Sequence, residues 1–295
     1  MSQFRARLRY LCRSGFGTCV TPNPPPSGPL SQHLGLVSDA FFLPDGDVFV
    51  PTDHTVGPWD PGAQHAGPPA ALLGRALEGH EGRPHMRVAR ITLEILRPIP
   101  IAPLKVECRM VRPGRSVEFL QASLSDSDRE VMRASAWRIR ADRAAVDIPP
   151  ETESPPPGPE QASPGPPIEV SHRCGYCEAM EWRFAQGGFQ EPGPATAWMR
   201  MRHPLVPGEE PSPLTRVLIA ADSGNGISGV LDPTRFLFVN TELTVHLFRY
   251  PEGEWVCLKS LTLIGPEGIG LAETGLYDET GRIGRGSQSL LVAPR

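Results

Sequence analysis

The second half of this 295-residue chain carries three polar residues that could do chemistry together: Asp222, Asn240 and Gln288. A carboxylate such as that of Asp222 can take a proton from water as a general base. The side-chain amides of Asn240 and Gln288 can hydrogen-bond a water molecule through either their nitrogen or their oxygen. One acid and two amides are therefore a set that could bind and activate water.

An internal repeat provides a control for this set. The two halves match at a constant offset of 152 residues, and at that offset the two amides stand where the first half carries Val88 and Ala136. The counterpart of the acid is Ala70 or, if the loop after the helix differs in length by one turn, Gly74. Burying a carboxylate and two amides costs free energy. The difference therefore indicates either that the second half exposes these groups or that they form a wet, functional cluster, which is the interpretation we favour.

The repeat follows segments in which apolar and polar residues alternate. Ile91-x-Leu93-x-Ile95-x-Arg97 returns as Leu243-x-Val245-x-Leu247-x-Arg249, and Val131-x-Arg133-x-Ser135 returns as Ile283-x-Arg285-x-Ser287. One gapless offset over roughly 45 residues is not a coincidence, and it sets the architecture before any single residue is interpreted. We predict two copies of one antiparallel β unit, fused in tandem.

Each copy is predicted to contain one buried helix followed by four strands. The first helix begins with two prolines, which cost nothing there because the first N–H groups of a helix have no partner within it. In the first copy we expect an opening strand and turn at 41–59, a helix at 67–77, and strands at 86–97, 103–112, 116–125 and 130–140. In the second copy we expect opening segments at 180–184 and 196–201, a helix at 213–227, and strands at 236–249, 254–264, 268–277 and 282–292. This order predicts an α+β fold in which each sheet wraps around a central helix.

The remaining segments divide the chain. Residues 1–33 are rich in arginine and proline and contain no acidic residue, which indicates a disordered tail or a start assigned too far upstream; such a segment can also resemble a transit peptide. The Pro-rich segment 141–171 is predicted to form no packed element and to link the halves. The two units then span 34–140 and 172–295.

Composition excludes several classes of protein. A net charge of −4 argues against a nucleic-acid binder, and no apolar run approaches the ~20 residues of a membrane span. We find no phosphate loop, dinucleotide fingerprint or metal-ligand spacing, so we expect no metal and no cofactor. Cys174 and Cys177 form a C-x-x-C without a second pair for zinc and without the context of a redox motif. We interpret that spacing as coincidence and expect a reducing cytoplasm as the compartment.

The pattern also resembles a known family. One helix followed by a four-stranded meander, with His65-Ala66-Gly67 at the start of the helix, is similar to the hotdog fold. Two fused copies with Asp222 in the second helix and a late Gln288 resemble the double-hotdog acyl-CoA thioesterases of the thioesterase II type, over about residues 39–294. The resemblance implies a double hotdog, two tandem units that each wrap an antiparallel sheet around a central helix.

The resemblance also implies a site. Members of that family hold a water with an Asp on the second helix, a Thr or Ser on the next strand and a Gln on the last strand. Those positions fall here on Asp222, Asn240 and Gln288. Asn240 departs from the family pattern, and the neighbouring Thr241 should point to the opposite face of its strand. An amide can still hydrogen-bond water, so the site is altered at this position but keeps a group that can bind the water.

The function that this implies is hydrolysis of an acyl-CoA thioester to the free acid and CoA. Asp222 would be the base, with Asn240 and Gln288 positioning the water. The start of the first helix, with His65 and Gly67 as substrate-binding residues, would polarise the carbonyl group; both residues also have a purely structural interpretation, at the start of the helix. Coenzyme A would be part of the substrate, and the chain would associate into a homo-oligomer through its sheets.

Two alternatives stay open. A non-catalytic protein that binds acyl-CoA or fatty acyl groups would explain an amide at position 240. A hydratase or dehydratase of the hotdog type needs an Asp–His or His–Glu pair at the helix, and no histidine accompanies Asp222 in the sequence.

Overall fold

The repeat in the sequence is also a repeat of strands. Strands β4 (Leu104–Arg112) and β12 (Val256–Ile264) begin and end 152 residues apart, and so do β5 (Val117–Asp126) and β13 (Ile269–Asp278). Along β5, buried residues alternate with partly exposed ones, as expected of a strand with one face on the core. The prediction of two antiparallel units with one gapless offset is therefore confirmed for these strands.

The computed structural model describes residues 39–83, 85–141, 154–166, 168 and 172–295. The predicted tail at 1–33 lies outside these residues. The elements of the first half are β1 (Phe42–Asp45), β2 (Val48–Pro51), the 3-10 helix η1 (Asp53–Thr55), α1 (Gly67–Gly79), η2 (His80–Gly82), β3 (Met86–Ile95), β4, β5 and β6 (Arg129–Arg140). Those of the second half are η3 (Pro159–Gln161), β7 (Ser163–Pro164), α2 (Gly175–Ala179), β8 (Met180–Gly188), β9 (Glu191–Met201), α3 (Pro213–Ala221), α4 (Gly224–Ile227), β10 (Phe236–Asn240), β11 (Glu242–Leu247), β12, β13 and β14 (Gly281–Pro294).

All described strands belong to one antiparallel sheet, in the order β1-β2-β4-β5-β6-β3-β11-β14-β13-β12-β9-β8-β7, with β10 also paired to β14. The halves meet where β3 pairs with β11. Thr92 lies opposite Thr244, its counterpart at the offset of 152, and the two hydroxyl groups are 3.2 Å apart. The junction is therefore symmetric about this pair, as expected if two copies of one unit are related by an approximate two-fold axis.

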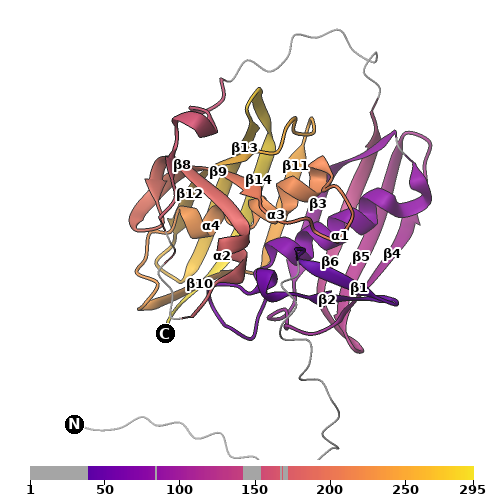
Figure 1. The fold of residues 1–295 in the computed structure, drawn as a ribbon, viewed down its shortest axis with the longest axis horizontal. Coiled ribbons are helices and arrows are strands. Elements are labelled where there is room, and N and C mark those ends of the chain that lie inside the picture. Colours follow the sequence, from indigo (N-terminus) through magenta and orange to yellow (C-terminus); the bar gives the residue numbers. More distant parts are fainter. Residues whose placement is uncertain (1–38, 84, 142–153, 167, 169–171) are drawn as a thin grey trace, which may run out of the picture. The chain divides into compact units, whose positions relative to one another are not determined.

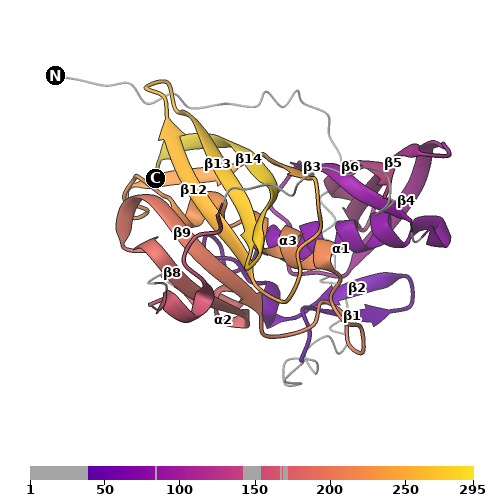
Figure 2. The same ribbon diagram turned by 90° about the horizontal axis from the view of Figure 1, so that it is seen from above.

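Helices α1 and α3 lie side by side on the same face of the sheet (Figures 1 and 2). They run antiparallel, because Gly67 at the start of α1 faces Ile219 near the end of α3, whereas Gly74 faces Leu214 and Leu218. A side chain on Gly67 would overlap the carbonyl oxygen of Ile219. Glycine thus permits close contact of the two backbones. At each end of the helix pair, the start of one helix lies beside the end of the other.

The end of α1 is held by a buried arginine. Arg138 on β6 donates through Nη1 to the carbonyl oxygens of Leu77 (3.2 Å) and His80 (2.9 Å), and it pairs with the buried carboxylate of Glu118 at 2.7 Å. These bonds satisfy carbonyl groups that the last turn of a helix leaves without partners.

Two expectations about the second half are wrong. The helix predicted at 213–227 is interrupted, since α3 ends at Ala221 and α4 begins at Gly224. The segment 141–171 does contain a packed element, because Ser163–Pro164 pairs with β8 and Trp198 donates to the carbonyl oxygen of Pro157 at 2.7 Å. Proline fits there because β7 is an edge strand.

Within the described residues, no helix combines the length and the apolar character needed to cross a membrane.

Candidate active site

The break between α3 and α4 places Asp222 at the centre of a cluster of polar groups. Asp222 is the residue that follows α3 and caps its end, with helical backbone angles, and its side chain is 5% exposed. Oδ1 accepts hydrogen bonds from Nδ2 of Asn240 at 2.9 Å and from Nε2 of Gln288 at 3.3 Å. The three residues predicted to act together therefore do converge, and they are not on an outer surface.

The two amides bind the carboxylate directly. Both donate to the same oxygen, Oδ1, so the other oxygen, Oδ2, remains available to a proton. The side-chain oxygen of Asn240, Oδ1, has no hydrogen-bond partner among the described residues. Because the residue is only half-buried, this oxygen can still accept a hydrogen bond from water. That Asn240 and Gln288 position a water remains a prediction; what the structure shows is that they orient Asp222.

Gln288 also hydrogen-bonds the backbone at the break between α3 and α4. Its Nε2 donates to the backbone oxygen of Asp222 at 3.1 Å, and its Oε1 accepts from the backbone N–H of Asn225 at 3.0 Å. Gly224 lets α4 approach this amide, since a side chain there would overlap Thr274. Asn225 was considered a residue that could steady the carboxylate, but its side chain bonds the backbone oxygen of Phe238 instead.

His65 reaches the same carboxylate from the first half. Its Nδ1 lies 3.3 Å from Oδ2 of Asp222 and accepts a hydrogen bond from the backbone N–H of Gly67 at 3.0 Å. Burial lowers the pKa of His65 below its ordinary value, although Asp222 opposes the shift. A neutral imidazole fits the bond from Gly67. Because Nδ1 has a single lone pair, it can take a proton shared with Oδ2 only when the bond from Gly67 is released.

The sequence placed no histidine near Asp222, but in the folded structure His65 is its neighbour, so the expectation that no histidine accompanies Asp222 is wrong. The two residues are distant in the sequence, and only the antiparallel packing of α1 and α3 brings the start of one helix to the end of the other.

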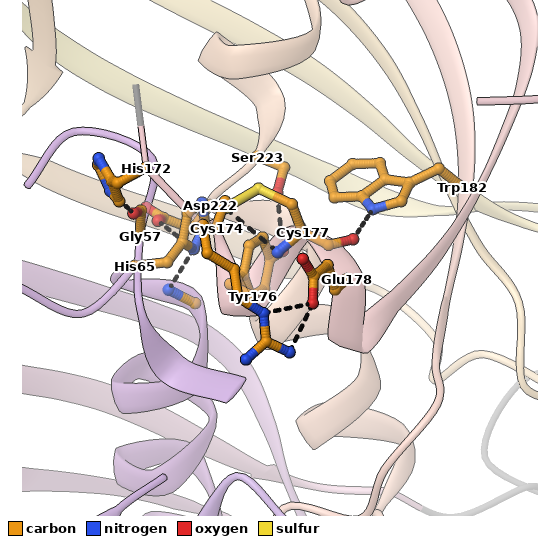
Figure 3. The surroundings of a disulfide bond; sticks show 12 residues. Gly57, His65, His172, Cys174, Tyr176, Cys177, Glu178, Trp182, Asp222 and Ser223 are labelled. Atoms are coloured by element: carbon orange, nitrogen blue, oxygen red, sulfur yellow. Dashed lines mark hydrogen bonds and ion pairs between the residues drawn. A yellow bond between two sulfur atoms is a disulfide. The ribbon is translucent and has the colours of Figure 1, made fainter. Parts of the chain in front are cut away.

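Tyr176 covers one face of the His65 imidazole ring. The two rings are stacked, with 3.7 Å between their centroids and 8° between their planes (Figure 3). The Tyr176 hydroxyl donates to the backbone oxygen of Ile219 at 2.8 Å and lies 2.8 Å from the hydroxyl of Ser223. Burial raises the pKa of this phenol, so it stays protonated.

Tyr176 sits inside the C-x-x-C sequence, and Cys174 and Cys177 form a disulfide. The interpretation of this spacing as coincidence is wrong. It judged the cysteines by the sequence around them, whereas their place in the fold puts the residue between them against His65.

The start of α1 was predicted to polarise a carbonyl group with its backbone N–H groups. It offers fewer free N–H donors than the start of a helix usually does. Pro68 and Pro69 have no N–H, that of Ala70 bonds the oxygen of Ala66, and that of Gly67 bonds His65. Only the N–H of Ala66 has no acceptor among the described residues. The close contact of Gly67 with α3 supports its structural interpretation, and its role as a substrate-binding residue stays a prediction.

The opposite end of the helix pair shows where the internal control fails for Asp222. Glu78, near the end of α1, accepts a hydrogen bond at 2.5 Å from Ser212, which caps the start of α3. An acid thus stands at both ends of the pair. Because α1 begins at Gly67 and α3 at Pro213, 146 residues apart, the helices do not keep the offset of the strands, and neither Ala70 nor Gly74 follows from the helix starts as the counterpart of Asp222. The control holds for the amides, since Val88 and Ala136 are buried and apolar.

The same offset identifies polar residues that the sequence interpretation missed. Ser260, Thr262 and Thr274 are buried beneath α4, where the hydroxyl groups of Ser260 and Thr274 are 2.9 Å apart and Thr262 lies 2.8 Å from Ser228. Their counterparts in the first half, 152 residues earlier, are Cys108, Met110 and Ala122. The interior of the second half is therefore polar well beyond the three predicted residues.

Comparisons with known proteins identify the family of both halves. A family model for the acyl-CoA thioesterase N-terminal domain matches residues 55–139, and one for the acyl-CoA thioesterase C-terminal domain matches residues 149–292. The chain belongs to the double-hotdog thioesterase II-like family. Comparison with curated protein sequences gave no significant match.

Solved structures share the double-hotdog fold at low sequence identity. A proposed thioesterase II from Thermobifida fusca is 16% identical, with a TM-score of 0.67, over 85% of this chain and 95% of that one. A hot dog protein of unknown function from Alicyclobacillus acidocaldarius is 15% identical, with a TM-score of 0.68, over 86% and 97%. The acyl-CoA thioesterase II TesB2 from Mycobacterium marinum is 13% identical, with a TM-score of 0.60, over 79% and 91%. At these identities the likeness concerns the fold alone.

Proposed function

We propose that this member of the thioesterase II-like family hydrolyses acyl-CoA thioesters, with Asp222 as the general base. The observation that carries the proposal is the arrangement of one buried carboxylate: two amides hold Oδ1, and Oδ2 faces the neutral imidazole of His65. Such an arrangement orients a base and leaves one of its oxygens available to a proton.

The chemistry proceeds in two steps. Oδ2 of Asp222 takes a proton from a water bound beside Asn240 while the water oxygen bonds the thioester carbon, and the carbonyl oxygen becomes an oxyanion. When the oxyanion collapses, the C–S bond breaks and the sulfur of CoA takes the proton from the Asp222–His65 pair. Nδ1 of His65 lies 3.3 Å from Oδ2, so the imidazole can hold this proton in the interval once Nδ1 has released the hydrogen bond from Gly67. The N–H of Ala66 is the backbone donor left to stabilise the oxyanion.

A second candidate, addition of water to an enoyl thioester or its reversal, gains support from the structure. The sequence counted against it because it needs an acid–histidine pair at the helix, and His65 and Asp222 form such a contact. The acyl-CoA thioesterase descriptions of both matched domains favour hydrolysis. A protein that binds acyl-CoA without turnover is the third outcome to be tested, since position 240 carries an amide.

One experiment separates the three. The protein is incubated with saturated and 2-enoyl CoA thioesters of several chain lengths, and CoA, free acid and 3-hydroxyacyl-CoA are separated by chromatography. We expect release of CoA and free acid in equal amounts. Formation of 3-hydroxyacyl-CoA with the thioester intact would identify a hydratase. Binding measured by calorimetry, without any product, would identify a binding protein, and either result would overturn the proposal.

A further inference from the structure

Tyr176 is tied to both partners of the Asp222–His65 pair. Its ring stacks on His65, and its hydroxyl group bonds that of Ser223, the residue after Asp222 (Figure 3). The hydroxyl group also donates to the backbone oxygen of Ile219 in the last turn of α3. Since the phenol has one proton and donates it to the oxygen of Ile219, the hydroxyl of Ser223 is the donor in the bond between the two hydroxyl groups. Tyr176 as a whole residue is 1% exposed, so its side chain has little freedom to move.

The segment that carries Tyr176 is docked against η1. The backbone N–H of Tyr176 donates to the oxygen of Val56 at 3.0 Å, and a side chain on Gly175 would overlap the oxygen of Asp53. The backbone N–H of His65 bonds the oxygen of Thr55 in the same short helix at 2.8 Å. One three-residue turn therefore sets the distance between the two stacked rings.

The disulfide closes the turn around Tyr176. Cys174 caps α2, its sulfur accepting from the backbone N–H of Cys177 at 3.3 Å, and the carbonyl oxygen of Cys177 accepts from Nε1 of Trp182 at 2.9 Å. Cys174 is buried, whereas Cys177 is half-buried. Two thiols cannot approach as closely as two bonded sulfurs, so cleavage of the bond must loosen the turn.

We propose that Tyr176 is a positioning residue for His65 and Asp222, and that the Cys174–Cys177 disulfide holds it in place, so that a dithiol reductant slows the reaction. This inference rests on the proposed hydrolysis for its kinetic effect. In the redox step the bond between the two sulfurs breaks, and each sulfur gains one electron and one proton. The dithiol supplies these two electrons and two protons as it is oxidised to its own disulfide. The expected compartment, a reducing cytoplasm, would then hold the protein in its slower form.

The kinetic test compares the wild-type chain with the variant Cys174→Ser/Cys177→Ser, each with and without dithiothreitol. Release of CoA is followed by chromatography, because the reductant interferes with thiol reagents. We expect reduction to lower kcat of the wild type about tenfold, with KM within about twofold, as for an error in positioning. The double variant should start at the lower kcat and ignore the reductant. A wild type that keeps its kcat when reduced, or a double variant that still responds, overturns the proposal.

Variants of Tyr176 separate positioning from stability. Tyr176→Phe keeps the stacked ring and loses two hydrogen bonds, whereas Tyr176→Leu loses the stacking as well. We expect kcat to fall in the order wild type, Phe, Leu, at a temperature where all three are folded. Tyr250→Phe, at the other end of the helix pair beside Glu78, is the control and should keep its kcat. Equal kcat values in all four proteins would show that Tyr176 serves stability alone.

A readout without substrate distinguishes failure of this inference from failure of the proposed function. The ring signal of His65, assigned by its loss in His65→Gln, is recorded by nuclear magnetic resonance before and after reduction. Loss of a ring stacked at 3.7 Å should shift it, while the signal of His246, which is exposed on β11, stays in place. A His65 signal that ignores both reduction and Tyr176→Leu would contradict the proposal even if no acyl-CoA is hydrolysed.

Discussion

Oδ2 of Asp222 lies 3.3 Å from Nδ1 of His65, although the acid ends the helix of the second half and the histidine precedes the helix of the first. Neither half contains this contact by itself. The antiparallel helix pair therefore explains why the fused repeat matters: one copy supplies the imidazole and the other supplies the carboxylate with its two amides.

Replacement of Asn240 tests whether the amide supports the base. Asn240→Val installs the residue of the first half and removes the shorter hydrogen bond to Oδ1, at 2.9 Å. A hydrogen bond to a charged group contributes about 1.5–3 kcal/mol, so we expect kcat/KM for acyl-CoA to fall about tenfold to a hundredfold. Asn240→Thr, which restores the hydroxyl of the family pattern, should retain more activity. Full activity in Asn240→Val would remove this residue from the site.

Replacement of His65 tests the shared proton. His65→Phe keeps a ring to stack on Tyr176 but cannot accept a proton, and we expect kcat to fall about a hundredfold. Because burial lowers the pKa of His65, the wild type should lose activity only at a pH below the ordinary value of 6.5. The phenylalanine variant should lack that acidic limb. An unchanged pH profile in the variant would assign the limb to another group.

The same shift affects stability. Below pH 6.5 the unfolded chain takes up a proton on His65, while the folded chain does so only at lower pH. The contribution of the neutral imidazole is therefore present above pH 6.5 and is lost as the pH falls below it. Urea denaturation should show that the free energy of unfolding of the wild type falls, relative to that of His65→Phe, as the pH is lowered below 6.5.

Two glycines of α1 form a matched pair for stability. Gly67→Ala would overlap the backbone oxygen of Ile219, whereas a methyl group on Gly79 meets nothing within 4 Å. We expect Gly67→Ala to destabilise the fold by about 1–3 kcal/mol and to reduce activity by displacing His65. Gly79→Ala should be neutral or stabilise by up to about 1 kcal/mol. Thermal denaturation measures both, and equal effects would contradict the close contact of α1 with α3.

Two arginines at equivalent places form a second matched pair. Arg249 binds both oxygens of the buried Asp278 carboxylate, at 2.5 and 2.7 Å. Among the described residues, Arg97 makes no ion pair with Asp126 and donates only to the backbone oxygen of Glu130, at 3.3 Å. We expect Arg249→Gln to cost about 3 kcal/mol and Arg97→Gln less than about 0.5 kcal/mol. Denaturant titration measures both, and a similar cost for the two would show that the ion pair adds nothing.

Asp278 also predicts how acid affects that pair. Burial alone would raise the pKa of Asp278, but hydrogen bonds from Arg249 and from the backbone of Glu252 and Thr280 lower it to about 2. Its contribution to stability is present above the ordinary pKa of 3.8 and is lost as the pH falls towards 2. The difference between wild type and Arg249→Gln should shrink over this range.

The strands could be predicted from the sequence because alternation and the offset of 152 act locally. β5 and β13 keep that offset at both ends, and the offset identified Val88 and Ala136 as the counterparts of Asn240 and Gln288. The choice of Asn240 and Gln288 themselves came from the resemblance to the thioesterase II family. The helices do not keep it, because their packing is set by contacts between the halves rather than by the pattern within one half. Glu78 was therefore missed as the acid at the other end of the pair.

The contact between His65 and Asp222 could not be predicted for the same reason. Which end of α1 meets which end of α3 depends on Gly67 and Gly74, whose small size becomes meaningful only when the opposite helix is known. Tyr176 was missed because the two cysteines beside it were judged as a motif. Neither a metal motif nor a redox motif describes a turn that holds one ring against another.

Glu78 makes the central claim directly testable. The account requires that hydrolysis occur at the end of the helix pair that contains Asp222, His65 and the two amides, and not at the end that contains Glu78. The decisive measurement is kcat/KM for acyl-CoA hydrolysis by the wild type, Asp222→Asn and Glu78→Gln, with folding checked by thermal denaturation. We expect Asp222→Asn to lose about 10²–10⁴-fold and Glu78→Gln to keep its activity. An active Asp222→Asn, or a loss confined to Glu78→Gln, would contradict the account.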